Sequence, residues 1–288
     1  MEPPIVTING IDFSLLESGP EDGPLALCLH GFPDTAHTWR HLLPALADAG
    51  YHAVAPWMRG YAPTGIPEDG AYQVGALAKD ACALHGALGG RHDAVVIGHD
   101  WGALAAYGAA VAEPDRWRRV VTMAVPPLAA SAGSFFAYAQ LKRSFYIFLF
   151  QLPLAEMAVA ADDLEFLDGL WADWSPGYDA TWDLARVKES IGAPENLAAA
   201  IGYYRAIFDS TRHLPAYAEA QAAAAGVPSQ PTLYLHGTAD GAMGVEATRD
   251  VGALLAPGSE HVTVEGAGHF LHLDQPAVVE AHVLGFLD

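Results

Sequence analysis

Basic residues and cysteines are scarce in this sequence, and each shortage excludes a class of function. The 288 residues include 14 lysines and arginines against 34 aspartates and glutamates, a formal net charge of −20. Such a charge repels phosphate backbones and anionic lipid, so we expect neither nucleic acid nor a membrane as partner. The two cysteines, Cys28 and Cys82, are too few for a disulfide framework, and we expect buried thiols in a reducing compartment.

Long apolar runs are also missing. The most apolar stretch, residues 145–159, is interrupted by Gln151, Pro153 and Glu156 and is too short to span a bilayer. The first residues show no basic segment followed by an apolar one, so no secretory signal is visible. We therefore expect a cytoplasmic protein. Hydrophobic residues make up 52% of the chain, a composition typical of a globular protein with one sizeable core.

The two ends of the chain alternate short apolar runs with helical patterns. Strands are predicted at 11–17, 25–30, 52–56, 94–98, 119–125, 231–236 and 261–265. Helices are predicted at 39–49, 74–88, 101–113, after Gly244 and at 275–287, the first two ending at glycines and the third before a proline. This alternation indicates an α/β fold with a doubly wound, mostly parallel sheet.

Residues 127–226 break this rhythm with aromatic-rich helical patterns and no obvious strand. The simplest interpretation is a helical cap inserted into an α/β core that consists of residues 1–126 and 227–288. The alanine-rich residues 216–226 are typical of a helix that leads out of the cap.

The strongest functional signal is a turn at residues 98–102, with the sequence GHDWG. It follows an apolar strand and precedes an alanine-rich helix, as a nucleophile elbow does, with Asp100 at the central position. Glycines on both sides permit the sharp turn, and the helix N-terminus stabilises an anion there. Asp100 as a simple helix N-cap is the plainer interpretation of the pentapeptide alone.

A second loop has the form and position of an oxyanion loop. The strand at 25–30 ends in residues 30–33, with the sequence HGFP. We expect the backbone N–H groups of Phe32 and Trp101 to form an oxyanion hole, and His30 and Pro33 to contribute to substrate binding. A strand-ending turn would explain the glycine and the proline separately, but not their pairing with the elbow.

Two further residues complete a triad in the order nucleophile, acid, histidine. Asp240 and His269 each lie just past a predicted strand, where His269 would activate water and Asp240 would fix its tautomer. Taken singly, each is more often a turn or structural residue. The spacing of His269 and His272 also suits a metal pair, but no cysteine or carboxylate cluster completes a site, so we expect no metal.

With these residues the chain resembles, over nearly its whole length, the epoxide hydrolases of the α/β-hydrolase fold. The resemblance implies a mostly parallel eight-stranded sheet flanked by helices. It also implies two cap tyrosines: Tyr204, in a Tyr-Arg pair, and Tyr146, ahead of a Phe-Gln-x-Pro segment. Aromatic packing is the plainer interpretation of both. One departure is Trp57, where the family usually has aspartate, and it concerns the shape of the pocket more than the mechanism.

The resemblance implies hydrolysis of a small, apolar epoxide to a vicinal diol. Asp100 would form an alkyl-enzyme ester, Tyr146 and Tyr204 would support ring opening, and no metal or organic cofactor has a task. A haloalkane or haloacid dehalogenase with the same nucleophile is the main alternative, and a catalytically silent binding module is another. The oligomeric state stays open, a homodimer being one possibility.

Overall fold

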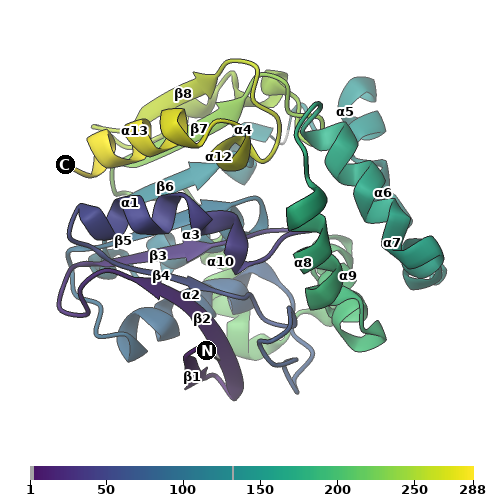
Figure 1. Ribbon diagram of the computed structural model, residues 1–288, viewed down its shortest axis with the longest axis horizontal. Coiled ribbons are helices and arrows are strands. Elements are labelled where there is room, and N and C mark those ends of the chain that lie inside the picture. The colour runs from purple at the N-terminus through teal and green to yellow at the C-terminus, as the bar shows by residue number, and fades with distance from the viewer. Residues whose placement is uncertain (1–2, 132) are drawn as a thin grey trace.

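An eight-stranded sheet runs through the middle of the molecule (Figure 1). The computed structural model describes residues 3–131 and 133–288. The strand order is β1-β2-β4-β3-β5-β6-β7-β8. The strands are β1 (Ile5–Ile8), β2 (Ile11–Ser18), β3 (Leu25–Leu29), β4 (His52–Pro56), β5 (Ala94–His99), β6 (Trp117–Met123), β7 (Thr232–Gly237) and β8 (Glu260–Val264).

Most neighbouring strands are parallel. Only the β1–β2 and β2–β4 pairs are antiparallel, whereas β4, β3, β5, β6, β7 and β8 run in one direction. Strands β3, β4, β5 and β7 are buried at every position, which explains why most of their residues are apolar. Because these strands are parallel, the loops that follow β3, β5, β7 and β8 leave from the same edge of the sheet.

Helices flank this sheet. Helix α1 (Leu42–Asp48) packs against α13 (Pro276–Leu287), and α2 (Val74–Ala87) packs against α3 (Trp101–Ala112). The short elements near the ends of strands are η1 (Ala36–Arg40), η2 (Pro114–Arg116), η5 (Val245–Thr248), α11 (Val251–Leu254) and α12 (Leu271–Asp274). This is the architecture expected for an α/β-hydrolase fold, so the predicted fold class is confirmed.

The segment between β6 and β7 contains helices and no strand in its described part, and its helices α5 to α9 lie to one side of the sheet (Figure 1). Its elements are α4 (Leu128–Ser131), α5 (Tyr138–Arg143), α6 (Phe145–Leu149), α7 (Ala155–Trp174), α8 (Thr181–Ile191), α9 (Pro194–Phe208), η3 (Ser210–Arg212), η4 (Pro215–Tyr217) and α10 (Ala218–Ala223). Helix α7 is interrupted by a left-handed turn at Asp162, Asp163 and Leu164. Helix α10 packs on α2 and α3, so we propose that the return to the core begins at α10.

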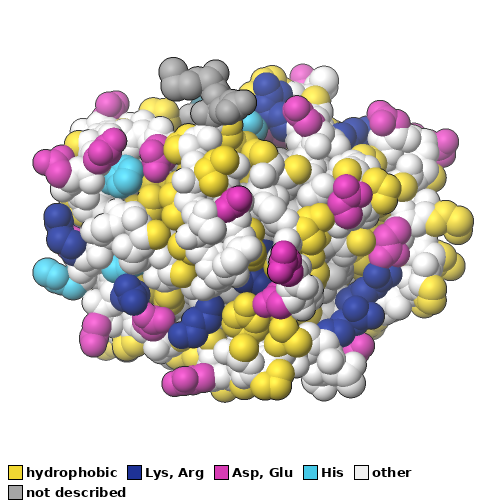
Figure 2. Space-filling model, turned by 90° about the horizontal axis from the view of Figure 1, so that it is seen from below, with side chains coloured by type: hydrophobic (Ala, Val, Ile, Leu, Met, Phe, Trp, Pro, Cys, Tyr) yellow, Lys and Arg dark blue, Asp and Glu magenta, His cyan; other side chains and the backbone are white. Residues whose placement is uncertain are grey.

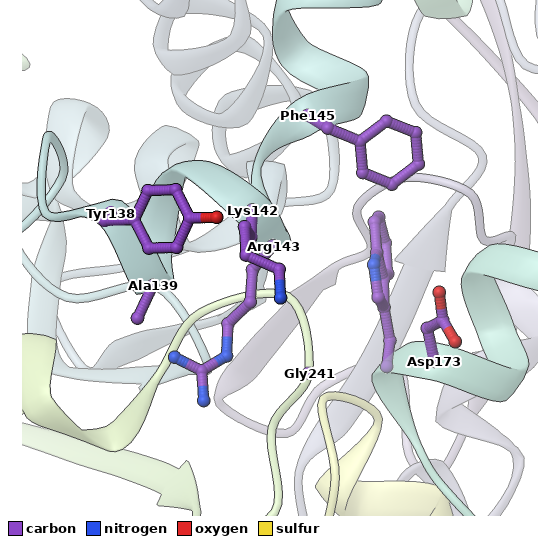
Figure 3. A pocket seen from close by; sticks show the side chains of 8 residues that line it. Tyr138, Ala139, Lys142, Arg143, Phe145, Asp173 and Gly241 are labelled. Carbon is purple, nitrogen blue, oxygen red and sulfur yellow. The ribbon is translucent and has the colours of Figure 1, made fainter.

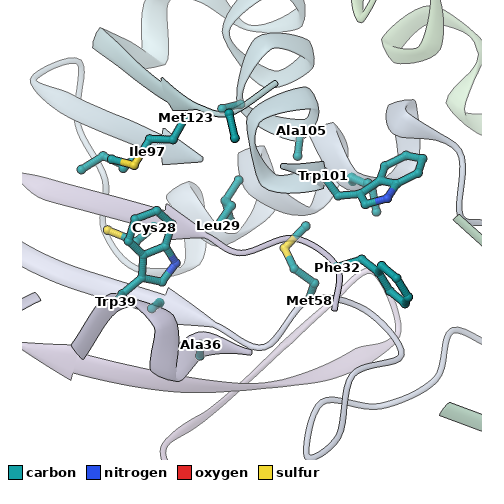
Figure 4. Close-up of a cluster of buried hydrophobic side chains, with 14 of the residues drawn as sticks. Cys28, Leu29, Phe32, Ala36, Trp39, Met58, Ile97, Trp101, Ala105 and Met123 are labelled. Carbon is teal, nitrogen blue, oxygen red and sulfur yellow. The ribbon is translucent and has the colours of Figure 1, made fainter. Parts of the chain in front are cut away.

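The core beneath the sheet edge also anchors the loops that carry the candidate catalytic residues (Figure 4). Phe32 and Trp101 belong to the same buried cluster as Leu29, Met58 and Met123. Their packing fixes the ends of β3 and β5 against each other. Both cysteines are buried and free, as predicted.

Most predicted elements are present, with shifted ends. Strand β6 begins at Trp117 rather than at residue 119, and the helix expected after Gly244 is reduced to η5 and α11. Strand β1 was missed because it is a short edge strand without a fully buried face. No described helix has the length and hydropathy of a membrane span. Acidic and basic side chains are interspersed over the face shown in Figure 2.

Candidate active site

Asp100 lies in the sharp turn between β5 and α3. Its backbone dihedrals, φ 53° and ψ −116°, fall outside the regions that non-glycine residues usually adopt. A Cβ atom at Gly98 would lie 2.1 Å from the carbonyl oxygen of Gly102, so the turn cannot close around a larger residue. Strain of this kind, at the edge of the sheet, is typical of a nucleophile elbow.

The loop after β3 brings a hydrogen-bond donor to this carboxylate. The backbone N–H of Phe32 donates to Oδ1 of Asp100 at 2.8 Å. A Cβ atom at Gly31 would lie 2.3 Å from the same oxygen, so only glycine permits this approach. The Trp101 amide, the second expected donor, makes no hydrogen bond to Asp100 within the described chain, and its role stays a prediction.

His269 lies between two carboxylates. Its Nδ1 is 3.0 Å from Oδ2 of Asp240, and its Nε2 is 3.7 Å from Oδ2 of Asp100. Asp240 can only accept from Nδ1, so Nε2 is the atom directed at the nucleophile. All three side chains are less than a tenth exposed. The structure thus brings together the three residues that the sequence placed after β5, β7 and β8.

The two carboxylates set the charge of His269. Burial alone would lower the pKa of its imidazole, but the charges of Asp240 and Asp100 and the hydrogen bond to Asp240 outweigh burial and raise the pKa to about 10. For Asp240, burial is outweighed in turn by His269, and the pKa of this carboxyl lies below its usual range. While Asp100 is ionised, the site therefore favours an imidazolium between two carboxylates.

The loop that carries Asp240 is held by backbone donors and by the helical segment. Oδ1 of Asp240 accepts from the N–H groups of Ala242 and Met243, both at 2.8 Å. Gln140 of α5 donates to the carbonyl of Ala242 and accepts from the N–H of Gly244. Sequence reasoning missed Gln140, because a lone glutamine on a short helix carries no chemical motif.

Trp174, at the end of α7, is a second residue that the sequence did not single out. Its carbonyl oxygen accepts from the backbone N–H groups of His269, at 2.8 Å, and Gly241, at 3.1 Å. Its ring contacts His269 and Tyr146 edge-on or tilted, with centroids 5.0 and 4.9 Å apart. One residue of the cap segment therefore contacts both the loop after β7, which carries Asp240 (the acid loop), and the loop after β8, which carries His269 (the histidine loop).

The two predicted tyrosines pack against each other near Asp100. Tyr146 of α6 and Tyr204 of α9 are buried, with ring centroids 5.5 Å apart. The Tyr204 ring also contacts Phe32 and Trp101, each with centroids 5.1 Å apart, and within the described chain its hydroxyl has no hydrogen-bond partner.

Both phenols are held in the protonated form. Burial raises the pKa of each tyrosine well above its usual value, and the nearby charge of Asp100 raises it further. Neutral phenols next to a carboxylate can donate hydrogen bonds to an oxygen that becomes negative in a reaction.

A cavity of about 450 Å³ lies where the cap segment meets the loop after β7 (Figure 3). It is lined by residues of α5, α6 and the end of α7, and by Gly241 of the acid loop: Tyr138, Ala139, Lys142, Arg143, Phe145, Asp173, Trp174 and Gly241. Trp174 also contacts His269, so this indole borders both the cavity and the histidine of the predicted triad.

The remaining residues of the HGFP loop face the interior. Nδ1 of His30 is 2.9 Å from the carbonyl of Gly31, and its Nε2 accepts from the N–H of Met58. Burial lowers the pKa of His30 to about 4. The carbonyl of Pro33 accepts from the indole of Trp171. These bonds tie the loop to its surroundings, and direct contact of His30 and Pro33 with a substrate stays a prediction.

The structure does not pair His269 with His272. His272 instead joins Asp34 and His99 in a buried group, each residue offering one atom, with these atoms within 4.8 Å of one another. This group lies among the loops after β3, β5 and β8. It is the only such group of metal-ligating residue types among the residues that the structure describes.

Comparison with known proteins gives a consistent assignment. The sequence profile of the α/β hydrolase fold matches residues 24–276. The chain is 32% identical to epoxide hydrolase A of Mycobacterium tuberculosis, over 98% of this chain and 96% of that protein. It is 30% identical to epoxide hydrolase 3 of Mus musculus, over 99% of this chain and 76% of that protein.

Solved structures agree with this assignment. The crystal structure of epoxide hydrolase A from Mycobacterium thermoresistibile superposes with a TM-score of 0.82 at 28% identity, covering 99% of this chain and 97% of that one. A putative epoxide hydrolase from Pseudomonas aeruginosa superposes with a TM-score of 0.84 at 26% identity, covering 99% of this chain and 95% of the other.

Proposed function

Because the chain belongs to the epoxide hydrolase family of the α/β-hydrolase fold, we propose that it hydrolyses an epoxide to a vicinal diol through a covalent ester on Asp100. The observation that carries the proposal is the pair of buried, protonated phenols near the nucleophile. A strained ring opened by a carboxylate needs a proton for its departing oxygen, and these phenols can supply it.

In the first step, an oxygen of Asp100 attacks a ring carbon and the bond between that carbon and the epoxide oxygen breaks. An ester forms, and the released alkoxide takes a proton from Tyr146 or Tyr204, leaving a phenolate. Since the pKa of each phenol is raised, the proton stays on the tyrosine until the more basic alkoxide develops.

The ester removes the charge of Asp100, and this changes His269. One of the interactions that raise its pKa is lost, so the imidazolium can release its proton to restore the phenol. Neutral His269 can then take a proton from water, while Asp240 stabilises the imidazolium that forms.

The second step returns the site to its starting state. Hydroxide attacks the ester carbonyl, whose oxygen becomes negative and is stabilised by the Phe32 amide that already donates to Oδ1. Collapse releases the diol alkoxide, which takes the proton of the newly formed Asp100 carboxylic acid. Asp100 is again a carboxylate beside protonated His269, and the sum is epoxide plus water to diol.

The substrate is proposed to be apolar. Aromatic rings surround the nucleophile on the cap side, with Phe150 and Trp174 completing the wall begun by the two tyrosines. Burial of apolar area would supply most of the binding energy of a substrate that packs against these rings. We propose no metal or organic cofactor, because each step is assigned to a side chain of this protein.

Two assays test the proposal. Turnover should be measured on apolar epoxides of graded bulk and on matched chlorinated and brominated alkanes; halide release faster than epoxide hydrolysis would favour the dehalogenase alternative instead. His269→Gln should then be mixed with the best epoxide. We expect a mass increase of one substrate on the peptide that holds Asp100, and its absence would refute the covalent route.

A further inference from the structure

Asp34, His99 and His272 form a buried junction between three loops of the proposed active site. Asp34 follows Phe32 by two residues, His99 precedes Asp100, and His272 follows His269 by three residues. Their side chains are at most 3% exposed, and the group of atoms that they offer lies within 4.8 Å. A displacement of these side chains would therefore shift the backbone next to Phe32, Asp100 and His269.

Each residue has one polar atom in a hydrogen bond and one without a partner. Oδ1 of Asp34 accepts from the N–H of Thr35, Nε2 of His99 is 2.9 Å from the carbonyl of His269, and Nε2 of His272 is 2.5 Å from Oγ1 of Thr38. Among the described residues, Oδ2 of Asp34 and Nδ1 of both histidines have no hydrogen-bond partner. Three such buried atoms, on side chains that offer atoms within 4.8 Å of one another, indicate a bound occupant.

The proton positions follow from these bonds. A carbonyl only accepts, so Nε2 of His99 carries the proton and its Nδ1 is an acceptor. If His272 donates from Nε2 to Thr38, its Nδ1 is an acceptor as well. An occupant must therefore donate to two imidazoles and also satisfy Asp34.

The spacing favours water over a metal ion. Oδ2 of Asp34 and Nδ1 of His99 are 3.9 Å apart. Bonds to zinc of about 2.1 Å in tetrahedral geometry hold ligand atoms about 3.4 Å apart. Hydrogen bonds of about 2.8 Å to one water hold its partners about 4.6 Å apart in the same geometry. The 3.9 Å separation lies between these two values, and the offered atoms of the three residues spread over up to 4.8 Å, which is wider than zinc would hold them.

We propose that one water molecule, which accepts a hydrogen bond from protonated Asp34 and donates to His99 and His272, joins the three loops. Through the bond from His99 to the His269 carbonyl, Asp34 is then a positioning residue for His269, a role that rests on the proposed function. Water has two protons and two lone pairs, so this arrangement satisfies the three unpartnered atoms without any charge.

The electrostatic surroundings support a neutral junction. Burial raises the pKa of Asp34 well above its usual value, and the charges of Asp183 and Arg40, which are paired with each other, act on it in opposite directions. Burial lowers the pKa of His99 to about 3 and that of His272 well below its usual value. A carboxylic acid and two neutral imidazoles are the forms that the hydrogen bonds require.

Asp34→Asn and Asp34→Leu test the proposal through thermal unfolding between about pH 4 and pH 9. Asparagine keeps the acceptor for Thr35 and offers an N–H to the water, whereas leucine offers neither. Folded wild-type protein retains a proton that the unfolded chain releases, so its stability falls as pH rises above the ordinary carboxyl pKa. The Tm of both variants should therefore gain on that of wild type as pH rises, and the Tm of Asp34→Leu should lie about 3–6 °C below that of Asp34→Asn at every pH.

An exposed aspartate provides the control, since Asp22→Asn removes a carboxylate without touching the junction. Its Tm difference from wild type should not show the increase with pH that is expected for Asp34→Asn. If the Tm of Asp34→Asn falls further below that of wild type as pH rises, Asp34 is ionised in the folded protein and the proposal is overturned. The proposal is also overturned if this Tm difference does not change with pH, or if purified wild-type protein holds a stoichiometric transition metal that Asp34→Asn lacks.

Activity separates the positioning role from the junction itself. Asp34→Leu should lower kcat about tenfold with KM little changed, since His269 is displaced rather than the pocket, and Asp34→Asn should restore most of that loss. Equal kcat losses in both variants would refute the positioning role. The pH dependence of unfolding needs no substrate, so it stands or falls separately from the proposed function.

Discussion

Removal of the Asp100 charge should weaken proton binding at His269. Nε2 of His269 and Oδ2 of Asp100 are 3.7 Å apart, and both side chains are buried. At an effective dielectric constant of about 20, unit charges at this distance attract by about 4 kcal/mol, or about a thousandfold in proton affinity. Asp100→Asn should therefore move the pKa of His269 well below about 10, while Asp240 keeps part of the upward shift.

The measurement is a pH titration of ¹⁵N-labelled histidine by NMR, with the His269 signals assigned by their loss in His269→Gln. Asp179→Asn removes an exposed carboxylate from the cap segment and should leave the titration in place. If His269 of Asp100→Asn still titrates near 10, then Asp100 does not control its charge. Ester formation at Asp100 could then not convert His269 from a proton donor into a base.

The same titration has a consequence for stability. The pKa of His269 is raised in the folded protein from 6.5 to about 10. The stabilisation that accompanies this proton is complete below about pH 6.5 and is lost as pH rises toward about 10. Between about pH 6.5 and about pH 10, the Tm of wild type should therefore fall by more than the Tm of Asp100→Asn.

Three further predictions concern other parts of the molecule. Tyr204→Phe should slow ester formation about 10²–10³-fold and leave ester hydrolysis nearly unchanged in stopped-flow experiments; equal slowing of both steps would argue against proton donation. Arg59→Met leaves buried Asp80 without its ion pair and should cost about 3–5 kcal/mol in urea unfolding, part of which a second change, Asp80→Leu, should recover. Gly98→Ala places its Cβ 2.1 Å from a backbone oxygen and should cost about 1–3 kcal/mol, whereas Gly252→Ala, with open space around it, should unfold like wild type.

Much of the core could be predicted from the sequence because its signals are local. Strands such as β3 and β5 are buried on both faces, and so β3 is apolar throughout and β5 is apolar up to Gly98. The elbow at Asp100 requires glycines at fixed positions, and the triad follows a fixed chain order. Strand β1 is only four residues long and has no buried face, and it escaped prediction for that reason.

The contacts between cap and core could not be predicted in this way. The carbonyl of Trp174 reaches His269, and the amide of Gln140 reaches the acid loop, only after the cap segment has folded over the core. The junction of Asp34, His99 and His272 likewise depends on the meeting of three loops that are distant in the chain. Tertiary packing leaves no periodic pattern in the sequence.

The central claim is that Asp100 forms an ester with the substrate, and single-turnover hydrolysis in heavy-oxygen water tests it most directly. With enzyme in excess over a confirmed epoxide substrate, the new oxygen of the diol comes from the carboxylate. We therefore expect unlabelled diol and label in the peptide that holds Asp100. Label in the diol of the first turnover, with none in Asp100, would contradict the account.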